Sequence, residues 1–216
     1  MKRLSISVRL RLAFAVLIAV IAVETWMAVN RMHAMYADFE AAVATQMTNA
    51  LTATEGAGYN GDNARLTAQA IADGSVSPAI EAEMKAQSMA LTGCIDELDY
   101  GVQDQHSREM LQKIRQLRTP YLDARKATLS LLKAGKRDDA RRKFNAEVLP
   151  ALKEYRKSWL DLAAYQGEMA RNSAKAAAEH YASGRNQVVG LSALAALIAL
   201  LFSIVVAHTI VSRQPK

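Results

Sequence analysis

Two long runs of apolar residues stand near the ends of the chain, and the second is the clearer. Residues 188–207 contain no charged side chain, with Arg185 before them and His208 after them. At 1.5 Å per residue, a helix of this length reaches about 30 Å, which is the thickness of the hydrocarbon core of a bilayer. The pattern predicts a membrane-spanning helix over residues 188–208.

The first apolar run is shorter and leaves two interpretations open. Residues 12–23 are uninterrupted, and four basic residues precede them, which also describes a secretory signal peptide. A cleavage site followed by a polar mature start is not evident, and apolar residues resume after Glu24. We therefore favour a retained membrane helix over residues 10–30. Glu24 and Trp26 would then lie toward the outer interface of the membrane, where tryptophan is common.

The basic residues gather at the two ends of the chain. The net charge is +6, and the residues outside 31–187 carry six basic side chains and one acidic. A nucleic-acid-binding domain would instead carry its basic residues as a patch on its folded surface. By the positive-inside rule, residues 1–9 and 209–216 are predicted to be cytoplasmic. Residues 31–187 would then form a periplasmic domain outside the bacterial inner membrane.

The apolar positions between the two runs follow the 3.6-residue period of helices. The pattern weakens at Gly56, Gly58 and Gly61, and again near residues 71–74, so residues 56–77 are predicted to be a frayed helix end and a connection. The stripe expected to face the core on this first helix consists of Met32, Phe39, Val43, Met47, Leu51 and Thr54.

The next two helices have clear start and stop signals. Ser77 can cap a helix that begins at Pro78 and ends near Gly101, because serine accepts from the first free N–H groups and proline suits the first turn. A third helix is predicted to begin with Asp104 or Ser107 as its cap. The apolar stripes are Ile80, Met84, Leu91, Ile95 and Leu98 on the second helix, and Ile114, Leu117, Tyr121, Ala124, Thr128 and Leu131 on the third.

The fourth helix restarts near Asp138, after Lys133 and Gly135, and has no clear stop before His208. Pro120 and Pro150 are expected to kink the third and fourth helices. The short turns predict an all-α, antiparallel up-down-up-down four-helix bundle flanked by two transmembrane helices. The core stripe of the fourth helix consists of Phe144, Val148, Leu152, Tyr155, Trp159, Leu162 and Met169.

Arg118, Tyr121 and Arg125 form the best candidate site. Their spacing of three and seven residues places them on one face of the third helix, and Tyr121 also belongs to the apolar seam. Two guanidinium groups beside a phenol suit a small organic anion, since arginine binds carboxylates through paired hydrogen bonds. Counting from the turn at 101–104, Ser88 should lie at the height of Arg118, and Thr92 near Arg115, so both hydroxyls could reach the same ligand.

A plainer interpretation also fits these residues. Arg118 and Arg125 can be surface residues with buried stems, paired with acids such as Asp96 or Asp123. Tyr155 and Trp159 are expected to be core residues rather than ligand contacts. The lone cysteine, Cys94, stands in a helical apolar pattern and is expected to be a small core residue, with a cross-link between two copies of the chain as the minor alternative.

Enzyme chemistry finds little support in the sequence. The four histidines have no metal-ligand spacing, and no cluster of cysteine and histidine occurs. The glycines at 56, 58 and 61 follow a helix rather than a strand, which is the wrong context for a dinucleotide-binding loop. We expect no catalytic activity, no metal and no cofactor.

Three short motifs stand out in the third and fourth predicted helices: Arg118-x-x-Tyr121-x-x-x-Arg125, Leu132-x-x-Gly135-x-x-x-x-Ala140 and Glu147-Val148-Leu149-Pro150-Ala151. These motifs and the layout of the chain resemble the sensor region of methyl-accepting chemotaxis proteins. The resemblance covers the whole chain by architecture and residues 118–151 by local motif. It implies a homodimer with the first and fourth helices toward the partner, and a role in chemotaxis signal transduction.

The chain departs from that family after the second apolar run. Such receptors continue into a HAMP linker and a long cytoplasmic hairpin that contacts a kinase and its coupling protein, whereas here residues 210–216 could only begin a HAMP linker. Either the chain is truncated or a partner supplies the output. The expected function is a transmembrane chemoreceptor sensor for a small carboxylate, such as a dicarboxylate. The alternatives are the sensor half of a histidine kinase and a membrane-anchored scaffold without a small-molecule ligand.

Overall fold

The computed structural model describes residues 6–212, which contain helices and no strand. The chain divides into two units: a helix-pair unit, Met1–Ala41 with Ser173–Lys216, and a bundle unit, Ala42–Asn172. The basic residues Lys2, Arg3, Arg213 and Lys216 lie outside the described residues. The elements are α1 (Ile6–Asp73), α2 (Pro78–Gly101), α3 (Gln105–Lys133), α4 (Arg137–Lys143), the π-helical segment η1 (Phe144–Val148) and α5 (Leu149–Ser212).

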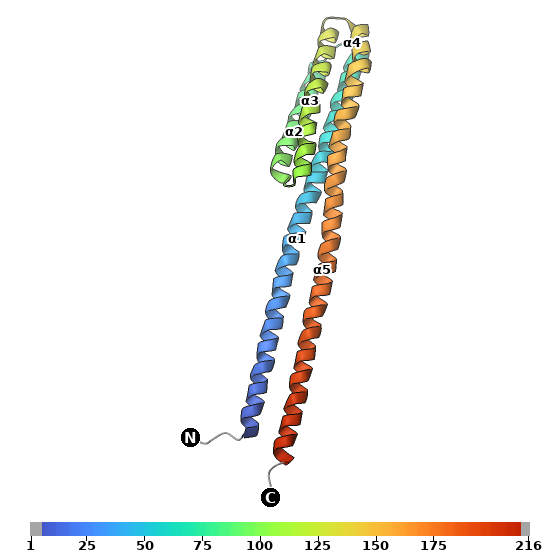
Figure 1. Cartoon of the computed structure of the whole chain (residues 1–216). Coiled ribbons are helices and arrows are strands. Elements are labelled where there is room, and N and C mark those ends of the chain that lie inside the picture. The colour runs from blue at the N-terminus through green and yellow to red at the C-terminus, as the bar shows by residue number, and fades with distance from the viewer. Residues whose placement is uncertain (1–5, 213–216) are drawn as a thin grey trace. The chain divides into compact units, whose positions relative to one another are not determined.

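The bundle unit has the predicted antiparallel order, with α2 and α3 forming a hairpin beside the later part of α1 and the start of α5 (Figure 1). Both predicted caps are present. The Ser77 side chain accepts from the N–H of Ile80, and the Asp104 side chain accepts from the N–H of Ser107. Each cap satisfies an N–H group that the first turn of a helix leaves free. These two caps position the α2–α3 hairpin that carries the candidate site.

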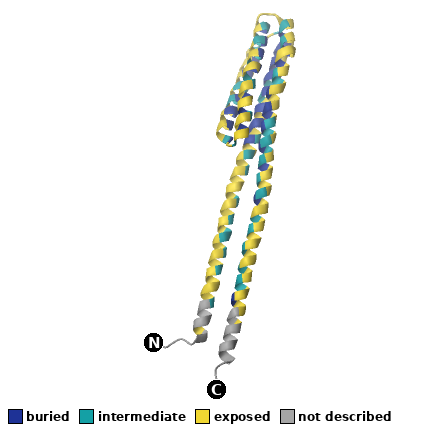
Figure 2. Ribbon diagram, in the orientation of Figure 1, coloured by how far each residue is buried: buried dark blue, intermediate teal, exposed yellow. Residues whose placement is uncertain are grey.

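The core of the bundle unit lies between its four helices, where the buried residues face one another (Figure 2). All five stripe residues predicted on α2 are buried, as are Ile114, Tyr121, Ala124 and Thr128 on α3. The largest fully buried side chains of α5 are Tyr155 and Trp159, each 0% exposed. Aromatic side chains of this size bury the most apolar area in a core. Cys94 is also buried, as predicted, and burial together with the charges of Glu55 and Glu97 raises the pKa of its thiol to about 11.

The predicted break at 56–77 is wrong, because α1 continues through all three glycines to Asp73. Gly56 is buried against the indole ring of Trp159, and a Cβ at this position would lie within 2.7 Å of three ring atoms. The glycine therefore allows a close approach between α1 and α5 instead of ending a helix. The real end of α1 is at Gly74, which has φ +76°, and the Arg137 side chain donates to the carbonyls of Ile71 and Ala72 there.

The predicted core stripe on α1 is also wrong. Met47 and Leu51 are 46% and 62% exposed. The face of α1 that packs inward consists mostly of small and polar residues, so the pattern of large apolar residues did not predict it. Its buried members in the bundle unit include Asn49, Thr52, Ala53, Ala57, Asn60, Asn63, Ala64, Leu66, Thr67, Ala70 and Ile71.

The irregularity that Pro150 predicts occurs as a π-helical segment directly before it. Proline has no N–H, and its ring clashes with the carbonyl four residues earlier. In η1, the N–H of Leu149 bonds to the carbonyl of Phe144, five residues back, so the helix is widened where the proline enters. α3 continues through Pro120 without ending.

The helix-pair unit consists of the first part of α1 and the last part of α5, each long and apolar enough to cross a membrane. Its large apolar side chains are exposed, as on lipid-facing helices; examples are Val16, Ile18, Leu194 and Leu197. A polar contact joins the two apolar segments, where the hydroxyl oxygens of Thr25 and Ser192 lie 2.5 Å apart.

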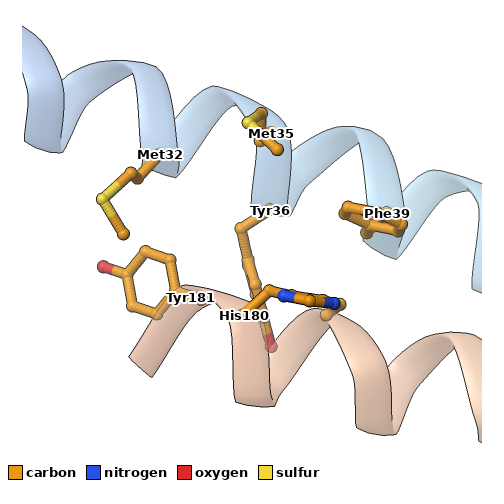
Figure 3. A pocket seen from close by; sticks show the side chains of 7 residues that line it. Met32, Met35, Tyr36, Phe39, His180 and Tyr181 are labelled. Carbon is orange, nitrogen blue, oxygen red and sulfur yellow. The ribbon is translucent and has the colours of Figure 1, made fainter. Parts of the chain in front are cut away.

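An aromatic cluster lies farther along the same unit (Figure 3). The ring of Tyr181 on α5 contacts the tilted rings of His33 and Tyr36 on α1, with ring centroids 5.4 and 5.3 Å away. Its hydroxyl lies 3.2 Å from Nε2 of His33. The neighbouring hollow, lined by Met32, Phe39 and other residues, has a volume of only about 50 Å³. The cluster is a packing contact between the two helices.

Candidate functional site

Four cationic side chains of α3 reach α2, and they fall into two kinds. The outer two form ion pairs: Arg115 with Asp99 at 2.5 Å, and Lys133 with Glu81 at 2.8 Å. The inner two meet only neutral hydroxyls of α2. Arg118 Nη2 donates to Thr92 Oγ1 at 2.6 Å, and Arg125 Nη2 donates to Ser88 Oγ at 3.2 Å. α2 thus offers carboxylates at the ends of α3 and none in the middle.

The structure brings all five predicted site residues together, but with a pairing one turn from the predicted one. Arg118 contacts Thr92 and not Ser88, and Ser88 contacts Arg125. Helical side chains lean toward the N-terminus of their own helix. The N-terminus of α3 is at the α2–α3 turn, so the long arginine side chains reach toward that turn, and counting residues along the backbone missed this displacement.

Ser88 and Thr92 hold the arginines and have no proton left to offer a ligand. The Ser88 hydroxyl donates to the carbonyl of Met84 at 2.7 Å, and the Thr92 hydroxyl donates to the carbonyl of Ser88 at 2.9 Å. Since a hydroxyl has one donor, these two can only accept from Arg118 and Arg125. They act as positioning residues rather than as the ligand donors that the sequence suggested.

The arginines themselves keep free donors inside the bundle. Arg118 Nε and Arg125 Nη1 are buried and have no hydrogen-bond partner in the described part of the chain. No ion pair between residues 6 and 212 joins either arginine to Asp96 or Asp123, the pairing of the plainer interpretation. Because an unpaired buried donor costs about 1–3 kcal/mol, the arrangement favours an anionic group from outside the chain.

Tyr121 lies between the two arginines and is 1% exposed. The guanidinium carbon of Arg125 lies 5.7 Å from the centroid of its ring. Its hydroxyl donates to the backbone carbonyl of Asn60 on α1 at 3.4 Å. Burial raises the pKa of Tyr121 despite the nearby Arg125, so the phenol stays neutral and the charge of the arginines is not cancelled within the site.

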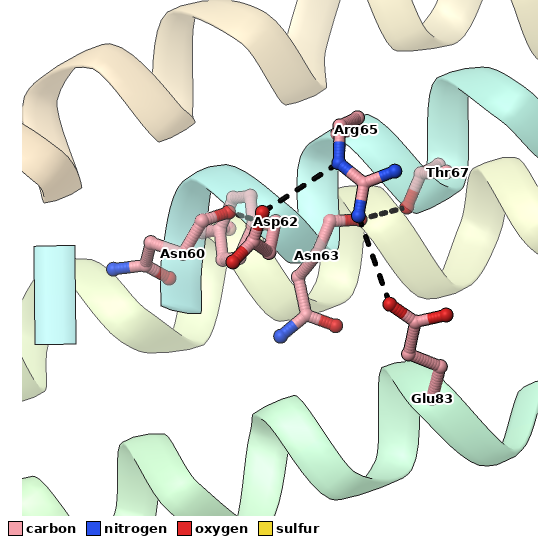
Figure 4. Close-up of polar contacts among 7 residues, drawn as sticks. Asn60, Asp62, Asn63, Arg65, Thr67 and Glu83 are labelled. Carbon is pink, nitrogen blue, oxygen red and sulfur yellow. Dashed lines mark hydrogen bonds and ion pairs between the residues drawn. The ribbon is translucent and has the colours of Figure 1, made fainter. Parts of the chain in front are cut away.

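Sequence reasoning missed two asparagines of α1 that share this interior. Asn60 and Asn63 are 0% and 1% exposed, and both side-chain amides lack a partner within the described residues. On the same helix, the half-exposed Arg65 pairs with Asp62 and Glu83, so the polar groups of this stretch are satisfied outside the core but not within it (Figure 4). Both asparagines lie in the glycine-containing stretch that the sequence predicts to be a frayed helix end, so they were not expected in the core. Asparagine inside a helix is nevertheless unusual enough to indicate a special role.

A second hollow of the bundle unit lies between α3 and α5 and has a volume of about 280 Å³. Its acidic residues already have cationic or amide neighbours, since Asp161 pairs with Lys157 and Glu109 accepts from Gln105. Across residues 6–212, no group of three or more histidine, cysteine or acidic side chains could hold a metal ion. Arg118 and Arg125 differ from these residues, because each keeps a buried donor without a partner in the described part of the chain.

The described residues form a helical bundle with two interior arginines, and its long helices α1 and α5 continue into apolar segments long enough to cross a membrane. The family model described as a four-helix bundle sensory module for signal transduction matches residues 3–181. The chain belongs to this family, and the match corresponds to the sensor region of methyl-accepting chemotaxis proteins, confirming the resemblance. Neither a curated protein nor a solved structure matches the chain.

Proposed function

We propose that this chain is the sensor module of a transmembrane chemoreceptor and that its bundle unit binds a small organic dianion between Arg118 and Arg125. The observation that carries the proposal is the pair of arginines without a carboxylate partner, each with a buried free donor. The family match supplies the signalling role. The ligand class rests on the chemistry of the site.

The separation of the arginines favours a ligand with two carboxylates. The two guanidinium groups bond to Thr92 and Ser88, which are one turn, about 6 Å of rise, apart on α2. A short dicarboxylate can place one end at each arginine. Two guanidinium groups also match two negative charges, so that binding leaves no net charge buried.

Transmission would follow from the continuity of the two long helices. α1 and α5 each extend from residues of the bundle unit into residues of the helix-pair unit. Helix shifts of about 1–2 Å are a common scale for signalling at interfaces. A ligand drives such a shift only through a difference in its affinity for two states of the bundle.

The proposed location is the bacterial inner membrane, with two membrane passes and the bundle unit in the periplasm. It rests on the basic residues at the ends of the chain and on the two apolar segments. We also propose a homodimer, with α1 and α5 toward the partner. The exposed Met47 and Leu51 of α1, with Leu149 and Leu160 of α5, supply apolar area that a partner subunit would cover.

A thermal-shift screen of the full chain in detergent micelles tests the proposal. The probes are malonate, succinate, glutarate and adipate, with butyrate as the monocarboxylate control. A dicarboxylate present at about 100 times its dissociation constant should stabilise the protein by about 2.7 kcal/mol, and butyrate at the same concentration should stabilise it less. Unchanged melting with all four dicarboxylates would contradict the proposal and favour the scaffold alternative.

A further inference from the structure

We propose that Asn60, Tyr155 and Trp159 form the inner end of the anion site, where they receive one carboxylate of the ligand together with Arg118, while Arg125 receives the other. This inference rests on the proposed function and assigns binding roles to residues that otherwise belong to the core. It makes the two ends of the site unequal: a buried end built by three helices, and an end at the α2–α3 interface.

The first observation is burial without partners. Tyr155, Trp159 and Asn60 are each 0% exposed. The Tyr155 hydroxyl, the Trp159 indole N–H and the Asn60 amide have no hydrogen-bond partner in the structure as described. Most buried polar groups in proteins are hydrogen-bonded. Three buried polar groups of α1 and α5 therefore have hydrogen-bonding capacity left for a bound group that is not part of this chain.

The second observation is that these groups lie together. The ring centroid of Tyr155 is 5.6 Å from that of Tyr121 and 6.2 Å from that of Trp159. Burial raises the pKa of Tyr155, whereas close polar contacts of its hydroxyl with the Trp159 indole and the Asn60 amide, together with the charge of Arg118, lower it. Arg118 is thus the arginine near Tyr155, whereas Arg125 is the arginine near Tyr121.

The chemistry of the groups identifies what they would bind. The indole N–H and the guanidinium can only donate, and the Tyr155 hydroxyl and the Asn60 amide can each donate as well. A group that accepts from all of them must offer several lone pairs and no proton. A carboxylate has two oxygens and about four acceptor sites, which fits this donor set beside a cation.

The inner end would also explain how binding reaches the signalling helices. Asn60 belongs to α1, Arg118 to α3, and Tyr155 with Trp159 to α5. One carboxylate bonded to all of them links α1 to α5 through the ligand. The close packing of Gly56 against Trp159 holds the indole at the same helix pair.

Tyr155→Phe is the sharpest test, because it removes only the buried hydroxyl and keeps the aromatic ring. The full chain in detergent micelles is titrated with the dicarboxylate probes, and Trp26→Phe leaves Trp159 as the reporter of tryptophan emission. We expect Tyr155→Phe to weaken dicarboxylate binding about tenfold without lowering the melting temperature of the free protein. Tyr165→Phe is the matched control, because Tyr165 lies on the same helix and its hydroxyl bonds to Asp104; its binding should be unchanged.

A double-mutant cycle locates the hydroxyl relative to the two arginines. The effect of Tyr155→Phe should be strongly non-additive with Arg118→Gln, which acts at the same carboxylate, and additive with Arg125→Gln. Ligand binding should also change the emission of Trp159. If dicarboxylates bind and depend on Arg118 but not on Tyr155, the inference is wrong while the proposed function stands. If no probe binds the wild-type chain, the proposed function itself fails.

Discussion

Replacing Gly56 by alanine is expected to lower the free energy of unfolding of the bundle unit by about 2 kcal/mol, within the range of overpacked cores. The new methyl group would lie within 2.7 Å of three ring atoms of Trp159. Trp159 is 0% exposed, so the indole can move only by displacing its neighbours. The better helix propensity of alanine, about 1 kcal/mol over glycine, offsets part of this cost. Thermal and urea unfolding followed by far-UV circular dichroism measure the change.

Two neighbouring glycines of α1 provide matched controls. A Cβ at Gly58 or Gly61 would meet nothing within 4 Å. Gly58→Ala and Gly61→Ala should therefore stabilise the protein, each by roughly 0.5–1 kcal/mol, through helix propensity alone. Equal effects of the three substitutions would contradict the close packing of α1 against Trp159. If all three substitutions instead reduced the helix content, the glycines would end a helix, as the sequence pattern suggested.

Loss of either inner arginine is expected to have the largest effect on ligand binding. Arg118→Gln and Arg125→Gln should each weaken dicarboxylate binding by about 10- to 100-fold, since a hydrogen bond to a charged group contributes about 1.5–3 kcal/mol. Lysine at either position should restore only part of the affinity, because it cannot bond a carboxylate through two parallel N–H groups. Titration calorimetry on the full chain measures these dissociation constants.

Arg115→Gln is the control for that experiment. Arg115 lies one turn from Arg118 on the same helix and is also an arginine, but its side chain is paired with Asp99. Its removal should leave the dicarboxylate dissociation constant within about twofold, because it gives up only an exposed ion pair. Equal losses for Arg115→Gln and Arg118→Gln would mean that the net charge of α3, and not the site, attracts the ligand.

The parts of the fold that the sequence could predict are those with local signals. Ser77, Asp104 and Gly135 act through their own backbone or the next turn, so α2 and α3 were placed within a residue or two. α1 could not be read this way, because its buried face consists of alanine, asparagine and threonine. Such a face fits only because large residues of α5 fill the space opposite, and that complementarity is a tertiary property.

The sequence could likewise predict one part of the candidate site and not the other. The spacing of Arg118, Tyr121 and Arg125 along one helix could be predicted from the helical period, and so could their nearness to Ser88 and Thr92. The exact partner of each arginine depended on the direction in which side chains lean. The inner group, Asn60 with Tyr155 and Trp159, combines residues of α1 and α5 that no sequence spacing connects.

Disulfide formation between Thr25→Cys and Ser192→Cys tests the central claim, that ligand binding in the bundle unit reaches the membrane helices. The hydroxyl oxygens of these two residues lie 2.5 Å apart in the helix-pair unit, and Cys94→Ala removes the native thiol. Full chains in lipid nanodiscs are oxidised with and without a bound dicarboxylate. We expect the ligand to change the cross-linking rate and Arg118→Gln to abolish that change. An identical rate with saturating bound ligand would contradict the central claim.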